Sequence, residues 1–108
     1  KLKDQFIIKI FTKKEIEYCE KTGMMKYQHY AARFAAKEAI FKAVSSKLKD
    51  KYEINWQNAE ILPDKYGRPN VNFIKLPDYL IEDLEYIDIS LSHIKEIAIA
   101  TCCINWRK

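Results

Sequence analysis

Glycine is scarce in this 108-residue chain, which contains only two. The two common phosphate-binding loops of nucleotide-binding proteins each need several glycines at fixed spacing, so neither loop is present. No run of apolar residues approaches the roughly 18 that a membrane-spanning helix requires. The first ten residues mix charged and apolar side chains and lack the apolar run and cleavage site of a signal peptide. We therefore expect neither a glycine-rich nucleotide loop nor association with a membrane.

Cysteine is also sparse, with three in the chain and no Cys-x-x-Cys spacing. Zinc sites usually carry that spacing, so we expect no zinc site. Cys102 and Cys103 are adjacent in a predicted strand, which places their side chains on opposite faces. Because Cys19 is remote from both, the three residues predict reduced thiols in a reducing compartment.

The overall composition is that of a folded protein, with 48% hydrophobic and 13% aromatic residues. The length predicts a single domain over residues 1–108. The formal net charge of +4 is mild and fits an acidic protein partner or a phosphate-rich ligand as well as nucleic acid. A basic single-strand-binding domain is one hypothesis, because seven tyrosines accompany the lysines. No nucleic-acid motif is present, however, and we expect no nucleic-acid partner.

A helix is predicted to begin after Thr12. Thr12 is followed three residues later by Glu15, which makes a capping box, and Phe11 and Ile16 can form the hydrophobic staple beside it. The helix is predicted to run to about residue 21 and to end near Gly23.

The second half of the chain changes to the short, alternating patterns of strands. Strands are predicted at residues 59–62, 71–75, 86–91 and 97–104, with a Gly- and Pro-containing turn at 63–69 and a short helix at 76–84. The last strand is apolar on both faces and is therefore predicted to be central. Helices followed by antiparallel strands indicate an α+β fold, with N-terminal helices packed on an antiparallel sheet.

A second, longer helix is predicted over residues 27–47 and contains the segment RFAAKEAIFKA. At about 100° per residue, its apolar side chains spread around most of the circumference, which predicts a helix buried on nearly all sides. Glu38 and Lys42 lie one turn apart inside it. Ala31 and Ala35 beside them would let a ligand come close, and buried charges need a partner or a ligand. The pair is either an ordinary helix-stabilising ion pair or part of a binding site.

Four segments follow one another in a specific order: FIIKIFTKKEIEYC from Phe6, RFAAKEAIFKA from Arg33, AEILPDKYGRP from Ala59 and ISLSHIKEIAIA from Ile89. In this combination, which spans nearly the whole chain, they resemble the holo-acyl-carrier-protein synthases, the small trimeric branch of the 4′-phosphopantetheinyl transferases. The resemblance implies the α+β fold of those enzymes.

The resemblance also implies a reaction. Such enzymes transfer the 4′-phosphopantetheine group of coenzyme A to a serine of apo acyl carrier protein, releasing 3′,5′-ADP, in fatty acid biosynthesis. A divalent metal, Mg²⁺ or Mn²⁺, would be held by Glu38, and Glu38 and Lys42 would be catalytic, with Lys42 neutralising the pyrophosphate. These residue types suit phosphoryl transfer, which is mostly positioning and charge neutralisation. Mg²⁺ usually takes one or two carboxylates plus phosphate oxygens.

Further contacts with coenzyme A follow from the resemblance for Arg33, Lys42, Gly67, Pro69, Ser92 and His93. His93 would contact the 3′-phosphate, and Gly67 and Pro69 would act through their backbone. Without the resemblance, His93 is equally well interpreted as a residue that caps a turn at the end of a strand, and Ser92 as an ordinary strand residue.

Acyl carrier protein and coenzyme A are the partners that the resemblance implies, together with a homotrimer whose active sites lie between subunits. Lys9 matches a basic position that faces the acidic carrier protein. Arg33 lies on a different helix face from Glu38, so it would serve a site shared with a neighbouring subunit. The compartment would be a bacterial-type cytoplasm or a plastid-type organelle.

The chain departs from the family pattern in two places. The family begins with a strand that carries Gly-x-Asp, whose Asp is the other metal ligand, and we expect this chain to be N-terminally incomplete with respect to that strand. The family's glycine-containing turn after the long helix is replaced by Ser45 and Ser46, so no nucleotide contact is assigned there. These departures leave an alternative, a non-catalytic module of the same fold that binds coenzyme A or the carrier protein.

Overall fold

The fold combines helices with two antiparallel hairpins. The computed structural model describes residues 2–93 and 97–107. Its elements are α1 (Leu2–Ile10), α2 (Lys13–Lys21), α3 (Lys26–Val44), β1 (Ala59–Pro63), β2 (Pro69–Phe73), α4 (Asp78–Asp83), β3 (Leu84–His93) and β4 (Ala98–Trp106). Short 3₁₀ turns connect α3 to β1. Strands β1 and β2 pair with each other, as do β3 and β4, so the predicted α+β class is confirmed.

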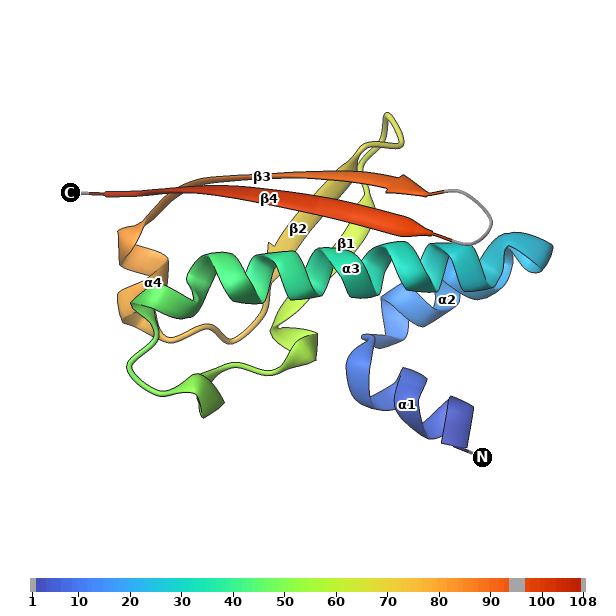
Figure 1. Cartoon of the computed structure of the whole chain (residues 1–108), viewed down its shortest axis with the longest axis horizontal. Coiled ribbons are helices and arrows are strands. Elements are labelled where there is room, and N and C mark those ends of the chain that lie inside the picture. The colour runs from blue at the N-terminus through green and yellow to red at the C-terminus, as the bar shows by residue number, and fades with distance from the viewer. Residues whose placement is uncertain (1, 94–96, 108) are drawn as a thin grey trace.

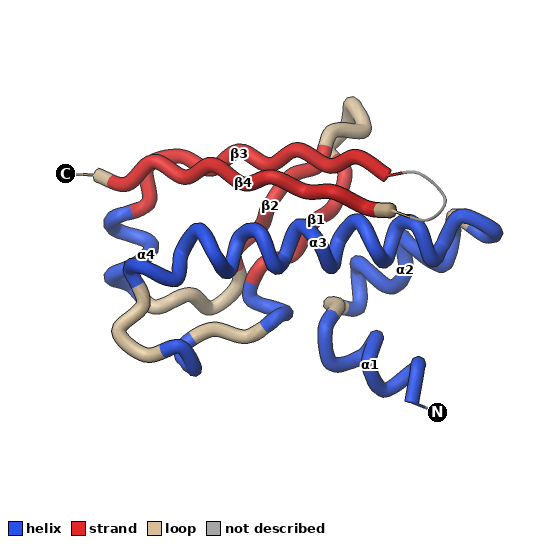
Figure 2. The backbone as a smooth tube through the Cα atoms, in the orientation of Figure 1, coloured by secondary structure: helices blue, strands red, loops and turns tan. Residues whose placement is uncertain are grey.

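Helix α3 is the axis of the molecule. Figure 1 shows it running along the β3–β4 hairpin, while the β1–β2 hairpin crosses both at a steep angle. Helices α1 and α2 lie toward the N-terminal end of α3, and α4 lies at the other end, where β3 begins (Figure 2). The main core is therefore the space between α3 and the two hairpins.

One stripe of α3 fills that core. Its apolar residues recur every fourth position, which places them on one face of the helix. The buried residues of the core are Ala36, Ile40, Val44, Ala59, Ile61 and Ile89. Ile87 and Leu91 of β3 pack against them, as the alternation of that strand predicts.

The predicted capping box is present at the start of α2. The Thr12 hydroxyl accepts a hydrogen bond from the backbone N–H of Glu15 at 3.2 Å, and the Glu15 carboxylate accepts one from the N–H of Thr12 at 2.9 Å. Phe11 is buried in a second core near α1, α2 and α3, and Ile16 packs against it. Helix α2 ends before Gly23, which has a positive φ of 63°, so the predicted end is also confirmed.

A buried ion pair joins α2, α3 and β1. Lys37 Nζ lies 2.9 Å from Glu15 Oε1, and both side chains are fully buried. The same ammonium donates hydrogen bonds to the carbonyl oxygens of Trp56 at 2.9 Å and Ala59 at 2.6 Å. The second oxygen of Glu15 accepts the backbone N–H of Ile61 at 2.8 Å. Burial lowers the pKa of Lys37, although the nearby carboxylate opposes this shift.

The prediction that the long helix is buried on nearly all sides is wrong. Glu38 and Lys42 are exposed, and the buried charges of α3 are Arg33 and Lys37. Lys37 rather than Glu38 is buried because its partner Glu15 lies on α2. The spacing of residues within α3 gives no information about a partner on another helix.

The prediction of a central last strand is also wrong for the described chain. Strand β4 pairs with β3 alone, so it is an edge strand. Its inner face packs on the core, whereas its outer face is open, with Ile99 60% exposed. Cys102 is half-buried and Cys103 exposed, on opposite faces as expected, and both are free thiols.

Within residues 2–93 and 97–107, none of the helices has the length and apolar character needed to cross a membrane.

Candidate functional site

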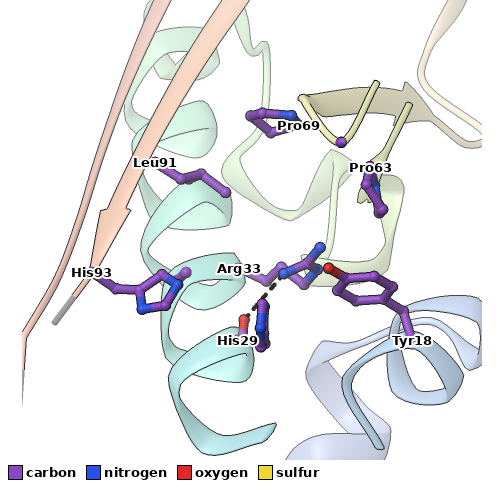
Figure 3. A pocket seen from close by; sticks show the side chains of 9 residues that line it. Tyr18, His29, Arg33, Pro63, Pro69, Leu91 and His93 are labelled. Atoms are coloured by element: carbon purple, nitrogen blue, oxygen red, sulfur yellow. Dashed lines mark hydrogen bonds between the residues drawn. The ribbon is translucent and has the colours of Figure 1, made fainter. Parts of the chain in front are cut away.

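A cavity of about 180 Å³ opens between α3, the end of β3 and the β1–β2 turn. The residues that give it its chemistry and shape are Tyr18, His29, Arg33, Gly67, Pro69 and His93. They come from four separate parts of the chain, as Figure 3 shows. The cavity thus brings together Arg33, Gly67, Pro69 and His93, which are four of the predicted contacts with coenzyme A.

Arg33 is the charged group of this cavity, and only 4% of it is exposed. Its Nε donates to the carbonyl oxygen of Ile61 at 3.0 Å, and Nη1 donates to that of His29 at 3.4 Å. The ring centre of Tyr18 lies 4.4 Å from the guanidinium carbon. Within the described ranges, no carboxylate lies at ion-pair distance from Arg33. A buried cation without a counter-charge is costly, and an anionic ligand in the cavity would offset that cost.

Two imidazoles stand beside Arg33. The ring centres of His29 and His93 lie 5.5 Å apart at 64°, and Tyr18 meets His29 edge-on at 5.5 Å. Nδ1 of His93 is buried and has no hydrogen-bond partner in the part of the chain that the structure describes. Buried polar atoms are normally bonded, so this nitrogen is available to a ligand or a water molecule.

A tight turn shapes one wall of the cavity. Gly67 has a φ of 82°, in the left-handed region that favours glycine. Its N–H donates to the carbonyl oxygen of Asp64 at 2.9 Å. The Asp64 carboxylate accepts the backbone N–H groups of Tyr66 at 2.8 Å and Arg68 at 2.9 Å, and these bonds, that from Arg68 first, lower its pKa. The turn therefore holds Gly67 and Pro69 in a fixed position at the cavity.

Glu38 and Lys42 lie on another side of α3. Glu38 is five positions after Arg33, which turns it about 140° away around the helix, and Lys42 is about 180° away. Both side chains are exposed, and no ion pair joins them among the described residues. The interpretation as an ordinary helix-stabilising ion pair is therefore wrong for this structure, and both charges are available to a ligand.

Two predicted site residues lie outside the cavity. Ser92 is exposed on the face of β3 opposite to that of its neighbour His93, because adjacent strand residues alternate. Lys9 is exposed in the last turn of α1. Neither contributes to the cavity within one chain.

A family model described as the 4′-phosphopantetheinyl transferase superfamily matches residues 1–102. The chain belongs to this superfamily. A holo-[acyl-carrier-protein] synthase from Ruminiclostridium cellulolyticum is 40% identical to it over 103 residues, which cover 94% of this chain and 75% of the relative. The resemblance inferred from the four sequence segments is therefore confirmed.

Solved structures of the superfamily share the fold. An ACPS–CoA complex from Chronobacterium ammoniagenes aligns with a TM-score of 0.76 at 25% identity, over 93% of this chain and 80% of the other. A holo-(acyl-carrier-protein) synthase from Bacillus anthracis, in complex with CoA (3′,5′-ADP), aligns with a TM-score of 0.75 at 28% identity, over 99% of this chain and 84% of the other.

Two polar residues that line the cavity of this transferase chain, Tyr18 and His29, were not predicted from its sequence. His29 precedes Arg33 by four positions, so helical spacing already places both on one face of α3. That signal was available in the sequence. Tyr18 lies on α2, and only the packing of α2 against α3 brings it to the cavity.

The donor set for a metal in this transferase is small. No group of three or more His, Cys, Asp or Glu side chains that could hold a metal occurs among the described residues. Glu38 is a single exposed carboxylate. It fits the mode in which Mg²⁺ takes one or two carboxylates and completes its shell with substrate phosphates and water.

Proposed function

We propose that this chain acts as a holo-[acyl-carrier-protein] synthase. It transfers the 4′-phosphopantetheine group of coenzyme A to a serine of apo acyl carrier protein and releases 3′,5′-ADP. The observation that carries the proposal is the buried Arg33, which has no carboxylate partner among the described residues and lies beside His93 in a cavity of a 4′-phosphopantetheinyl transferase chain. An anionic ligand is what such a cavity requires.

The cavity is assigned to the nucleotide end of coenzyme A. Arg33 and His93 would hold the 3′-phosphate, because a guanidinium and an imidazole together supply charge-assisted hydrogen bonds to phosphate oxygens. Gly67 and Pro69 would border the nucleotide through their backbone. Ser92 lies on the outer face of β3. It would therefore contact a phosphate of coenzyme A only if part of that ligand lies outside the cavity.

Glu38 and Lys42 are assigned to the reacting phosphate. The serine oxygen attacks the phosphorus that carries the pantetheine arm, and the bond from that phosphorus to the bridging oxygen of the pyrophosphate breaks. Lys42 would neutralise the charge that develops on the pyrophosphate, which is the main contribution that a protein makes to phosphoryl transfer. Glu38 would help to remove the proton from the serine hydroxyl.

Glu38 is also the residue of this chain that would hold Mg²⁺ or Mn²⁺. A bound divalent ion would polarise the phosphate oxygens and neutralise negative charge on the leaving group. The exposure of Glu38 leaves room for phosphate oxygens and water around such an ion.

A homotrimer would bring together the two parts of the site, which are the cavity with Arg33 and the pair Glu38 and Lys42. Within one chain, α3 directs Arg33 and Glu38 to different sides, about 140° apart. If neighbouring subunits pack so that Glu38 and Lys42 of one chain face the cavity of the next, one molecule of coenzyme A contacts both. Ile99 on the outer face of β4 and Ile97 just before that strand are exposed, and they offer apolar surface for such packing.

The carrier protein would dock near α1. Lys9 is exposed there, and a lysine side chain attracts an acidic partner. The product of the reaction would serve fatty acid biosynthesis, in a bacterial-type cytoplasm or a plastid-type organelle.

A transfer assay tests the proposed function. The protein is incubated with coenzyme A, Mg²⁺ and apo acyl carrier protein, and the carrier protein is then weighed by mass spectrometry. We expect the increment of one phosphopantetheine group, its loss when a chelator is added, and its return with excess Mg²⁺. Coenzyme A binding without transfer would instead favour the non-catalytic binding module, and no binding at all would reject the assignment of the cavity.

Two substitutions test the catalytic roles proposed for Glu38 and Lys42. Glu38→Gln and Lys42→Met should each slow transfer by about 100-fold or more, because each removes a charge from the reacting centre. Both residues are exposed, so the free energy of unfolding should change by no more than about 0.5 kcal/mol. Full transfer by either variant would refute its assigned role.

A further inference from the structure

His29 is a cavity residue for which the proposed function has no role. It lies one helical turn before Arg33, and its ring stands between those of Tyr18 and His93, each at 5.5 Å between ring centres. Figure 3 shows His29 directly below the Arg33 side chain, with His93 on one side and Tyr18 on the other. From this position, a ring nitrogen of His29 can contact the same ligand as Arg33 and His93.

The groups that face His29 come from several elements of the described chain. Tyr18 faces it from α2, Arg33 from its own helix and His93 from β3, while the β1–β2 turn contributes Pro63, Gly67 and Pro69, which do not titrate. Among the described residues that line the cavity there is no carboxylate. A proton on His29 is therefore repelled in the free protein and stabilised only when an anion enters the cavity.

We infer that His29 is a further phosphate-binding residue of this cavity and that binding of a phosphate group there is coupled to proton uptake by His29. The inference rests on the proposed function, which supplies coenzyme A as the phosphate-bearing ligand. Its specific content is that a positive charge on His29, present only when ligand is bound, joins Arg33 and His93 in holding the phosphate. Discrimination between coenzyme A and its 3′-dephospho form then depends on pH.

The sign of this dependence follows from the surroundings. Burial first, and then the charges of Arg33 and His93, lower the pKa of His29 in the free protein. His29 is therefore mainly neutral near pH 7 before ligand binds. A phosphate dianion raises that pKa, so the complex binds more protons than the free protein does. By linkage, affinity for the phosphate rises as pH falls and is lost as pH rises through the pKa of His29 in the complex.

The experiment compares the wild-type protein with two variants of the same residue. His29→Gln keeps a polar side chain without a titrating proton, and His29→Phe keeps the ring contacts with Tyr18 and His93. The dissociation constants of coenzyme A and 3′-dephospho-coenzyme A are measured by calorimetry between about pH 6 and pH 8. Two buffers of different ionisation enthalpy at each pH give the number of protons taken up.

We expect both variants to bind coenzyme A about tenfold more weakly than wild type at low pH, the equivalent of one charge-assisted hydrogen bond. The difference should shrink as pH rises, and the variants should take up fewer protons on binding. For 3′-dephospho-coenzyme A, all three proteins should have the same affinity and the same pH dependence. Because the phosphate group itself also titrates, the difference between wild type and variants is the quantity that reports on His29.

Nuclear magnetic resonance gives a direct readout. The chain contains two histidines. The His29→Gln spectrum therefore assigns the imidazole signals of His29 and His93. The pKa of His29 should lie below the ordinary value in the free protein and rise when coenzyme A is added, but not when the dephospho form is added.

The inference is overturned if wild type and both variants show equal proton uptake and parallel pH curves, or if the pKa of His29 is the same with and without ligand. In either of these outcomes wild-type transfer and coenzyme A binding persist, so the proposed function stands. If wild-type protein neither binds coenzyme A nor transfers its arm, the proposed function fails, and the inference fails with it.

Discussion

The charged residues of α3 have three different environments, although they lie close together in sequence. Lys37 is buried and paired with Glu15, whereas Arg33 is buried and has no carboxylate partner in the described part of the chain. Glu38 and Lys42 are exposed. A buried ion pair stabilises the fold. A buried charge without a counter-charge, or two exposed charges that do not pair with each other, can instead bind a ligand. The burial of a charged side chain and its ion-pair partners therefore show whether it has a structural or a functional role, which its residue type alone does not show.

Replacing Lys37 tests the structural part of that division. Lys37→Met should lower the free energy of unfolding by about 3 to 5 kcal/mol, because it leaves the Glu15 carboxylate buried without a counter-charge. Lys42→Met is the matched control, since it makes the same chemical change on the exposed side of the same helix. Its effect should stay within about 0.5 kcal/mol. Urea unfolding measures both, and equal effects would contradict the division.

At the scale of the element, the β1–β2 turn depends on one glycine. Gly67 has a φ of 82°, and, apart from the two residues next to it in the chain, no described residue has an atom within 4 Å of the position that a Cβ would occupy. A side chain at this position would therefore destabilise the turn through the unfavourable positive φ, and not through clashes with neighbouring residues. Gly67→Ala should lower the free energy of unfolding by about 1 to 2 kcal/mol. Gly67→Asn should cost less, because asparagine tolerates positive φ.

Thermal or urea unfolding of the two Gly67 variants gives the stabilities, and coenzyme A binding gives the effect on the cavity. An alanine variant as stable as wild type, or less destabilised than the asparagine variant, would show that the turn relaxes to a negative φ.

The elements that sequence predicted correctly are those whose signals are local. The capping box at Thr12, the end of α2 before Gly23 and the inward face of β3 each depend on a few neighbouring residues. The fold class and four residues of the cavity were also predictable, from the order of elements and from the family resemblance.

The elements that sequence predicted wrongly depend on distant partners. Lys37 rather than Glu38 is buried because α2 brings Glu15 to it. The apolar residues of β4 suggested a central strand, yet its outer face, including Ile99, is not covered by any described residue. His29 was not predicted, although its spacing from Arg33 was visible in the sequence. A single histidine on a helix indicates a site only when its neighbours are known, and here these are the rings of Tyr18 and His93.

At the scale of the whole molecule, the candidate site is divided. The cavity with Arg33 and His93 lies on one side of α3, and Glu38 and Lys42 lie on another. A single chain does not direct both halves at one phosphate-bearing ligand. In the proposed trimer, Glu38 and Lys42 of one subunit would face the cavity of its neighbour and so complete the site.

Subunit mixing tests this account most directly. Glu38→Gln and Arg33→Met proteins, each verified as a trimer, are unfolded together, refolded and assayed for phosphopantetheine transfer by mass spectrometry. Each variant alone should be inactive, and a random 1:1 mixture should regain up to about one quarter of wild-type activity, from sites that combine an intact Glu38 with an intact neighbouring Arg33. A mixture of Glu38→Gln with Lys42→Met is the control and should regain none, because both residues belong to the same half-site. Recovery confined to the first mixture is the predicted result, and no recovery in it would contradict a site shared between subunits.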